Sequence, residues 1–217
     1  MKEDTLVVHE IYRSVQGEST FVGVPCTFVR LTGCNLRCAW CDTPQAFYKG
    51  RRMLRGDVLR EALALGTPLV ELTGGEPLLQ PGVFPLLREL CDAGRTVLIE
   101  TSGEADVSRV DPRVHKIMDL KAPGSGESLR NRYENLSHLT KRDEIKFVLK
   151  DRVDYEWMRA TIDERMLATL GPTLLASPVW GDLDPKSLVD WVLEDGLPVR
   201  VQVQLHKVIW GRDALGV

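Results

Sequence analysis

Three cysteines lie close together in the stretch GCNLRCAWCD, residues 33–42. Cys34, Cys38 and Cys41 directly follow an apolar, β-branched run at 26–31 that has the composition of a strand. We therefore place the three thiols on a loop at the carboxyl end of that strand. Folds that alternate parallel strands with helices bind their ligands at these strand ends. The stretch thus indicates both a fold class and the position of a site.

Three thiolates at this spacing can surround one soft metal centre, whereas the gaps between them are too short for relaxed disulfides. Zinc is one alternative, but a closed zinc site takes four ligands and the sequence has no second cysteine pair. The fourth ligand would have to be Cys26, Cys91, His9, His115, His138 or His206. A 4Fe-4S cluster held by three thiolates instead leaves one iron open, which an enzyme can use to coordinate a substrate or cofactor.

The other two cysteines carry no such pattern. Cys26 lies in the strand-like run and Cys91 ends a helix-like run, so we expect both to be buried, inert thiols. Five cysteines, an odd number, argue against a secreted disulfide framework and for metal or redox use in a reducing compartment.

The composition excludes several classes of protein. The 217 residues are 43% hydrophobic and 27% charged, which is ordinary for a globular chain. A formal net charge of −3 gives no bulk electrostatic case for binding nucleic acid or an anionic membrane. Residues 1–10 lack a secretory apolar core, and no stretch reaches the about 18 apolar residues of a membrane helix. We expect a cytoplasmic protein with no nucleic-acid or membrane partner.

Strand-like and helix-like segments alternate along the chain. Strands are predicted at 26–31, 69–72, 96–100, 116–119, 144–149, 173–176 and 200–205. Helices are predicted at 57–65, 83–93, 129–142, 155–168 and 185–194, the last with Asp184 as N-cap before Pro185. Such alternation favours parallel strands joined by right-handed crossovers, but the chain is too short for a full eight-unit barrel of about 250 residues. We predict an α/β fold, a partial parallel (β/α) barrel formed by one domain over 1–217, with a flexible loop at 121–128.

The cysteine spacing C-x3-C-x-aromatic-C, with Trp40 as the aromatic residue, resembles the signature of the radical S-adenosylmethionine (radical SAM) superfamily. The resemblance implies a 4Fe-4S cluster whose open iron binds the amino and carboxylate groups of S-adenosylmethionine. One electron from the cluster then cleaves that cofactor to a 5′-deoxyadenosyl radical. The stretch TGGEP at 73–77 resembles the superfamily's GGE motif, which binds the cofactor's amino group.

The same resemblance implies a set of cofactor-binding residues at neighbouring strand ends. The segment at 177–180, Ser-Pro-Val-Trp, departs from the Gln-Pro and polar residue that some members carry. The implied residues are Trp40, Gly74, Gly75, Glu76, Ser102, Asp119, Leu120, Lys121 and Ser177. Lys146 lies inside an otherwise apolar strand, so its ammonium either faces solvent or meets an anion in the site.

Other segments narrow the choice of radical enzyme. The blocks at 10–19 and 28–35 and the tail at 204–207 resemble the 7-carboxy-7-deazaguanine synthase family, and the resemblance runs from about residue 9 to residue 211. It implies conversion of 6-carboxy-5,6,7,8-tetrahydropterin to 7-carboxy-7-deazaguanine with loss of ammonia, on the path to queuosine and other deazapurines. It also implies Mg²⁺, a homodimer, and reduction by a protein such as flavodoxin or ferredoxin.

Carried over by position, the resemblance implies that Thr43 contributes its hydroxyl to Mg²⁺. A pterin with amide edges and a carboxylate calls for amide, backbone and guanidinium partners. The implied substrate-binding residues are Val15, Gln16, Gly17, Arg30, Thr73, Glu100 and His206, although His206 is equally compatible with a structural role. No general acid or base is assigned.

Two other functions share the cysteine spacing. A glycyl-radical-enzyme activating enzyme is also short and cytosolic, but it needs a docking surface for a large partner and no pterin pocket. The chain could also be a non-enzymatic iron–sulfur or zinc protein, in which case the motifs at the other strand ends would have no role in binding a cofactor.

Overall fold

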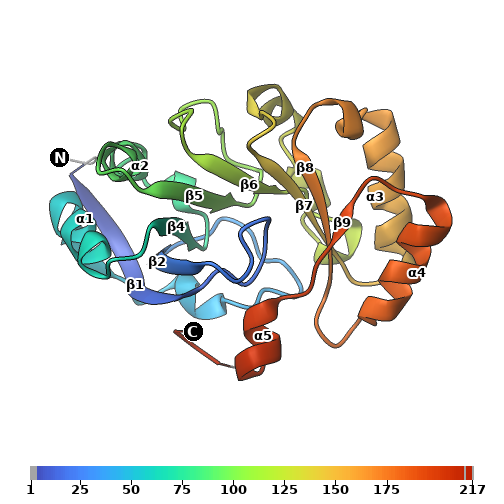
Figure 1. Ribbon diagram of the computed structural model, residues 1–217, viewed down its shortest axis with the longest axis horizontal. Coiled ribbons are helices and arrows are strands. Elements are labelled where there is room, and N and C mark those ends of the chain that lie inside the picture. Colours follow the sequence, from blue (N-terminus) through green and yellow to red (C-terminus); the bar gives the residue numbers. More distant parts are fainter. Residues whose placement is uncertain (1–3, 213, 217) are drawn as a thin grey trace.

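The computed structural model describes residues 4–212 and 214–216, which form one curved sheet flanked by helices (Figure 1). Residues 1–3, 213 and 217 of the predicted domain lie outside the described residues. The strands are β1 (Thr5–Val15), β2 (Pro25–Leu31), β3 (Arg51–Leu54), β4 (Leu69–Gly74), β5 (Thr96–Thr101), β6 (His115–Asp119), β7 (Glu144–Leu149), β8 (Thr173–Pro178) and β9 (Arg200–Val201). The helices are α1 (Arg55–Ala64), α2 (Val83–Asp92), α3 (Arg152–Glu164), α4 (Pro185–Asp195) and α5 (Leu205–Trp210).

Within the described residues, the strands pair in the order β3-β1-β2-β4-β5-β6-β7-β8-β9. Every pair from β2 to β9 is parallel, whereas β1 pairs antiparallel with β2 and β3. The two ends of this order, β3 and β9, do not pair with each other, so the barrel stays open. The predicted α/β class with a partial parallel barrel is confirmed.

Side chains that face the helices form two apolar layers. One joins α1 and α2 to the first half of the sheet and the other joins α3 and α4 to the second half. The helix predicted from the apolar spacing at 83–93 is confirmed as α2. Its residues Val83, Leu86, Leu87 and Leu90 lie on one helical face, and all are buried. The predicted N-cap of α4 is also confirmed, because the Asp184 carboxylate accepts the Lys186 N–H at 3.2 Å.

The helix predicted over 129–142 is wrong. The structure has two short 3-10 segments there, Ser128–Arg130 and Tyr133–His138. The amide of Asn135 is buried, accepting the Val107 N–H at 3.2 Å and donating to the Ala105 carbonyl at 2.8 Å. Asn131 likewise bonds both backbone groups of Lys121. These tertiary hydrogen bonds override the helical spacing of the apolar residues.

The strand predictions also need correction at both ends of the chain. β1 and β3 were not predicted. β3 is the edge strand and begins with two arginines, and β1, next to it, has a short apolar run at 6–8 followed by mixed polar and apolar residues. β9 ends at Val201 rather than at residue 205. The chain leaves the sheet there because the Gln202 and Gln204 side chains reach Ser19 and Glu18, respectively.

The barrel interior changes character along the strands. Near the amino ends of the parallel strands it is filled by Cys26, Phe28, Leu69, Leu98 and Ile117, which form one apolar cluster. Two positions further along each strand, the inward side chains are charged: Arg30, Glu71, Glu100 and Asp119. The apolar cluster therefore fills the barrel at the amino ends of the parallel strands, and we call it the hydrophobic plug. The polar groups lie at the carboxyl ends, where ligands bind in such folds.

The open side of the barrel is bridged by residues 16–24. The Ser19 N–H donates to Gln202 at 2.8 Å, and the Thr20 N–H donates to Glu144 on β7 at 3.1 Å. The Leu205 N–H also donates to the Gly17 carbonyl at 2.9 Å. The segment thus connects the two ends of the sheet. None of the helices in the described part of the chain is long and apolar enough to cross a membrane.

A buried ion pair supports β6 and β7, and its loss should destabilise the fold. Lys116 Nζ lies 3.1 Å from Asp143 Oδ2, and the two side chains are 5% and 1% exposed. Asp143→Ala leaves the ammonium buried and uncompensated, so we expect the free energy of unfolding to fall by about 3–5 kcal/mol. Urea unfolding followed by circular dichroism measures this. The control is Asp190→Ala in the exposed Lys186–Asp190 pair, for which the change stays below about 1 kcal/mol. Equal effects of the two substitutions would contradict the assignment.

Candidate active site

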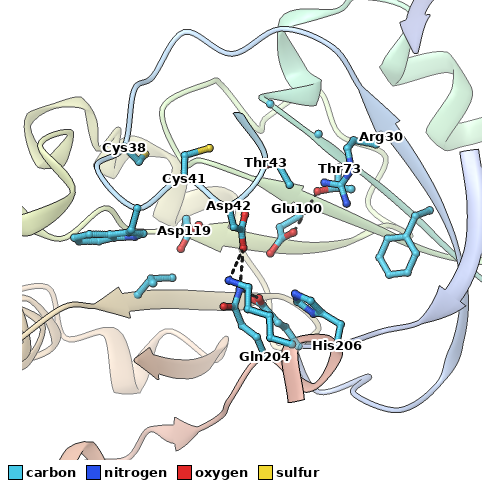
Figure 2. A pocket seen from close by; sticks show the side chains of 18 of the residues that line it. Arg30, Cys38, Cys41, Asp42, Thr43, Thr73, Glu100, Asp119, Gln204 and His206 are labelled. Atoms are coloured by element: carbon cyan, nitrogen blue, oxygen red, sulfur yellow. Dashed lines mark hydrogen bonds and ion pairs between the residues drawn. The ribbon is translucent and has the colours of Figure 1, made fainter. Parts of the chain in front are cut away.

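A pocket opens at the carboxyl ends of the parallel strands. Figure 2 shows Cys38 and Cys41 at one end of it and Arg30 and Thr73 at the other, with Glu100 between them. The predicted residues that line it are Val15, Gln16, Gly17, Arg30, Cys34, Cys38, Trp40, Cys41, Thr43, Thr73, Gly74, Gly75, Glu100, Ser102, Asp119, Lys121, Ser177 and His206. Nearly all of the predicted set therefore comes together in space, although its members come from segments far apart in the sequence.

Two of the predicted residues lie behind the pocket wall. Leu120 is fully buried in the apolar layer under α3 and α4. The Glu76 carboxylate accepts hydrogen bonds from the Thr101 hydroxyl at 2.9 Å, the Ser102 N–H at 2.7 Å and the Ser102 hydroxyl at 2.6 Å. Burial raises the pKa of Glu76, and these donors partly offset the increase. Glu76 therefore fixes the end of β5 and places Ser102 in the wall.

The cysteine loop is anchored to its neighbours by backbone hydrogen bonds. The Ala39 N–H donates to the Ser125 carbonyl at 3.0 Å, and the Arg37 N–H donates to the Glu127 carboxylate at 2.6 Å. The loop predicted at 121–128 is thus a support for the cysteines and includes a 3-10 turn at Pro123–Ser125. All three thiols are free and half-buried, whereas Cys26 is fully buried, as expected, and Cys91 is only partly buried.

The donor set of this loop, three half-buried thiols, fits an iron–sulfur cluster that takes three protein ligands. Among residues 4–212 and 214–216, no three His, Cys, Asp or Glu side chains are grouped so that they could hold one metal ion. An iron–sulfur cluster is larger, and its thiolate ligands stand further apart around it. Burial raises the pKa of the Cys34 and Cys38 thiols, and the Lys121 ammonium partly offsets this at Cys38. Iron binding would displace the thiol protons.

Two glycines let β4 approach the cysteine loop closely. A Cβ at Gly75 would lie 2.2 Å from the Gly33 carbonyl oxygen and 2.8 Å from Cys34 Cβ. Gly74 has a φ of +137°, and a Cβ there would lie 2.1 Å from the Leu31 carbonyl oxygen. Any larger residue would push the two loops apart, which explains the Gly-Gly pair in physical terms.

Two polar atoms in the wall are buried without a hydrogen-bond partner in the described structure. They are Asp119 Oδ1 on β6 and Ser177 Oγ on β8. The other oxygen of Asp119 pairs with Lys121 Nζ at 2.7 Å, and although burial alone would raise the pKa of Asp119, the Lys121 and Lys146 ammonium groups lower it. Unsatisfied buried polar atoms are uncommon in folded proteins, so a polar ligand is expected to bind here.

Lys146 points into the pocket, which settles the alternatives left by the sequence. Its ammonium lies 2.8 Å from Glu18 and 3.9 Å from Asp119 and also pairs with Glu100. Burial alone would lower the pKa of Lys146, but the Glu100 and Glu18 carboxylates raise it well above its ordinary value. One ammonium thus joins three carboxylates from different segments.

The predicted substrate residues are linked to acidic partners. Arg30 Nε donates to Glu10 at 2.8 Å, so its charge is already matched within the protein. The Thr73 hydroxyl donates to Glu100 at 3.2 Å. A Cβ at Gly17 would lie 2.2 Å from His206 Nδ1, so only glycine lets the 16–24 segment pack against this ring.

Several pocket residues were missed at the sequence level. Asp42 Oδ2 accepts hydrogen bonds from Gln204 and Lys207, each at 3.1 Å, and the Gln204 and His206 side chains lie beneath Asp42 and Thr43 in Figure 2. Although burial alone would raise the pKa of Asp42, the Lys207 ammonium lowers it. The missed lining residues include Glu10, Tyr12, Glu18, Asp42, Glu71, Gln204 and Lys207. Glu71 carried a usable signal, since it is a charge inside an apolar strand, as Lys146 is.

Comparisons with known proteins identify the family of the chain. The family model of the Radical SAM superfamily matches residues 28–149. The chain is 47% identical to the 7-carboxy-7-deazaguanine synthase of Chlorobaculum tepidum, with 99% of each chain covered. It is 46% identical to the protein of that name from Koribacter versatilis, with 97% of this chain and 99% of that one covered.

A solved structure shares the fold. The crystal structure of QueE from Escherichia coli superposes with a TM-score of 0.73 at 26% identity and covers 93% of this chain and 95% of that one. The chain therefore belongs to the Radical SAM superfamily and, within it, to the 7-carboxy-7-deazaguanine synthase family.

Proposed function

We propose that this protein converts 6-carboxy-5,6,7,8-tetrahydropterin to 7-carboxy-7-deazaguanine with loss of ammonia, in the biosynthesis of queuosine and other deazapurines. The observation that carries the proposal is one pocket in which a three-thiol loop faces a polar wall of carboxylate, ammonium and amide groups. Relatives that are named 7-carboxy-7-deazaguanine synthase match the chain over almost its full length. Neither alternative function has support of this kind.

At the cysteine end of the pocket, Cys34, Cys38 and Cys41 would hold the 4Fe-4S cluster and leave one iron open. Bound there, the cluster and S-adenosylmethionine supply the radical that abstracts a hydrogen atom from the substrate. The residues proposed to bind S-adenosylmethionine are the wall residues Trp40, Gly74, Gly75, Ser102, Asp119, Lys121 and Ser177, together with Glu76 and Leu120 behind them. The unpartnered Asp119 and Ser177 oxygens support this assignment, since each can accept a hydrogen bond from a polar ligand.

At the other end, the 15–17 segment, Arg30, Thr73, Glu100 and His206 would orient the pterin. Lys146 holds Glu18 and Glu100 in fixed positions there, so these carboxylates need not reorganise when the substrate binds. The 16–24 segment and the Gln204–Asp42 hydrogen bond border one side of the pocket.

We further propose that Thr43 binds Mg²⁺. Its side chain lines the pocket next to Asp42 and makes no capping hydrogen bond to the short 3-10 segment that it precedes, so the hydroxyl is available to a ligand. Mg²⁺ prefers oxygen ligands and retains several waters, so one hydroxyl together with oxygens of the substrate would suffice.

The remaining assignments follow from the family. We propose a single domain over 1–217 that acts as a cytoplasmic homodimer and receives its electron from a flavodoxin- or ferredoxin-type protein. Light scattering of the purified protein tests the dimer.

The reaction itself is directly testable. The anaerobically reconstituted protein, incubated with a reductant, S-adenosylmethionine and the carboxytetrahydropterin, should release ammonia and 7-carboxy-7-deazaguanine, detected by mass spectrometry. Omission of the reductant is the control. A protein that cleaves S-adenosylmethionine but leaves the pterin unchanged would overturn the proposal.

Cys38→Ala tests the ligand assignment. The substitution removes one of three thiolates, so we expect loss of cluster iron and of reductive S-adenosylmethionine cleavage, with the circular dichroism spectrum unchanged. Cys91→Ala is the matched control, because Cys91 lies on α2 outside the pocket lining. Cleavage retained by the Cys38 variant would contradict the assignment.

Thr43→Val tests the magnesium proposal. The variant keeps the shape of the side chain but lacks the hydroxyl, so the turnover rate should become insensitive to added Mg²⁺. Thr43→Ser retains the hydroxyl and should keep the response. An unchanged Mg²⁺ dependence in the valine variant would rule out this ligand.

A further inference from the structure

Glu71 is a carboxyl group in the pocket wall that the proposed function has not used. It lies in the middle of β4, in the otherwise apolar run LVELT, and is 1% exposed. One carboxyl oxygen, Oε2, accepts a hydrogen bond from the Gln16 amide. The other oxygen, Oε1, has no hydrogen-bond partner in the described part of the chain, although Glu71 lines the pocket. A buried polar group in this position is available to a ligand.

The charges around Glu71 show which kind of ligand group it can accept. Glu18, Glu71 and Glu100 lie together, and Lys146 is the cation that pairs with Glu18 and Glu100. Burial and the neighbouring Glu100 raise the pKa of Glu71 well above its ordinary value, despite the opposing effects of Lys146 and Arg30. Because Arg30 already pairs with Glu10, this part of the pocket has more carboxyl groups than cations to match them. A ligand that offers N–H donors relieves the imbalance, whereas a carboxylate is repelled.

The proposed substrate has two unlike ends. Its pyrimidine ring carries a 2-amino group and ring N–H donors, and its C6 substituent is an anionic carboxylate. The acidic part of the pocket distinguishes these ends, because only the first can donate hydrogen bonds. In Figure 2, Glu100 lies between the labelled cysteines and Arg30, so a ligand bound on the Arg30 side leaves the cysteine end for the cluster.

We propose that Glu71 is a specificity-determining residue that accepts a hydrogen bond from the 2-amino group of the substrate's pyrimidine ring. This inference rests on the proposed function and adds the orientation of the ring. The free oxygen of Glu71 makes the contact, while the other oxygen holds Gln16. The amide oxygen of Gln16 in turn accepts the Glu18 N–H at 2.7 Å. A chain of hydrogen bonds would therefore run from the substrate's 2-amino group through Glu71 and Gln16 to the backbone of the 16–24 segment.

The test combines a change in the protein with a change in the ligand. Binding of the carboxytetrahydropterin and of its 2-deamino analogue is measured by anaerobic equilibrium dialysis, with the reconstituted cluster and S-adenosylmethionine present and no reductant. The wild-type protein should bind the amino ligand about tenfold or more tightly than the analogue. Glu71→Met, which fills the site without a hydrogen-bonding group, should reduce that preference to about twofold or less. Glu71→Gln should give an intermediate preference.

A matched control uses a second buried glutamate. Glu144 on β7 is also buried and accepts hydrogen bonds from Thr20, but it lies outside the pocket lining. Glu144→Gln should keep the wild-type preference. Iron content and circular dichroism confirm that each variant is folded and loaded. If Glu71→Met is not folded and loaded, the Glu71→Gln protein serves as the test. Its preference for the amino ligand over the analogue should then be at least about threefold smaller than that of the wild type.

The outcomes separate a contact from a supporting role. If Glu71 only holds Gln16, the methionine variant loses affinity for both ligands by the same factor, and the proposal is wrong. A preference equal to that of the wild type also overturns it. If the wild-type protein binds neither ligand, the proposed function fails as well, and this result is distinct because it appears before any substitution is made.

Discussion

The buried ammonium of Lys146 is the interaction on which the pocket depends. It compensates Glu18 from the 16–24 segment, Glu100 from β5 and, at longer range, Asp119 from β6. Without it, these carboxylates would face one another in a buried site, where repulsion and the loss of hydration both oppose ionisation. The cation therefore lets an acidic pocket exist, and it links the wall assigned to the cofactor with the wall assigned to the substrate.

Each parallel strand contributes apolar side chains to the barrel interior at its amino end and polar side chains to the pocket at its carboxyl end. Inward side chains near the amino ends are apolar and pack into a plug, and those near the carboxyl ends are polar. β4 shows the change within one strand, from Leu69 through Glu71 to Thr73. The hydrophobic plug fills the barrel on the amino-end side of the pocket, so charges in the pocket interact more strongly than they would at the surface.

The sequence was sufficient for those parts of the molecule that depend on local pattern. Three thiols after a strand, a Gly-Gly pair and alternating segments indicated the fold and the cysteine end of the pocket, whereas the predicted substrate residues came from the resemblance to a known family. The errors arise where distant contacts decide. Asn135 replaces a predicted helix with a tertiary hydrogen-bond network. The role of Glu71 could not be inferred without knowing that Gln16 and Glu100 lie beside it.

The contact between the 16–24 segment and α5 also bears on the order of assembly. His206 packs against Gly17, and Lys207 and Gln204 reach Asp42, next to the third cysteine. A ribosome makes α5 after every element that it contacts. The hydrogen bonds from Gln204 and Lys207 to Asp42 therefore form only after all the strands have been synthesised, and until then the end of the cysteine loop lacks these two contacts.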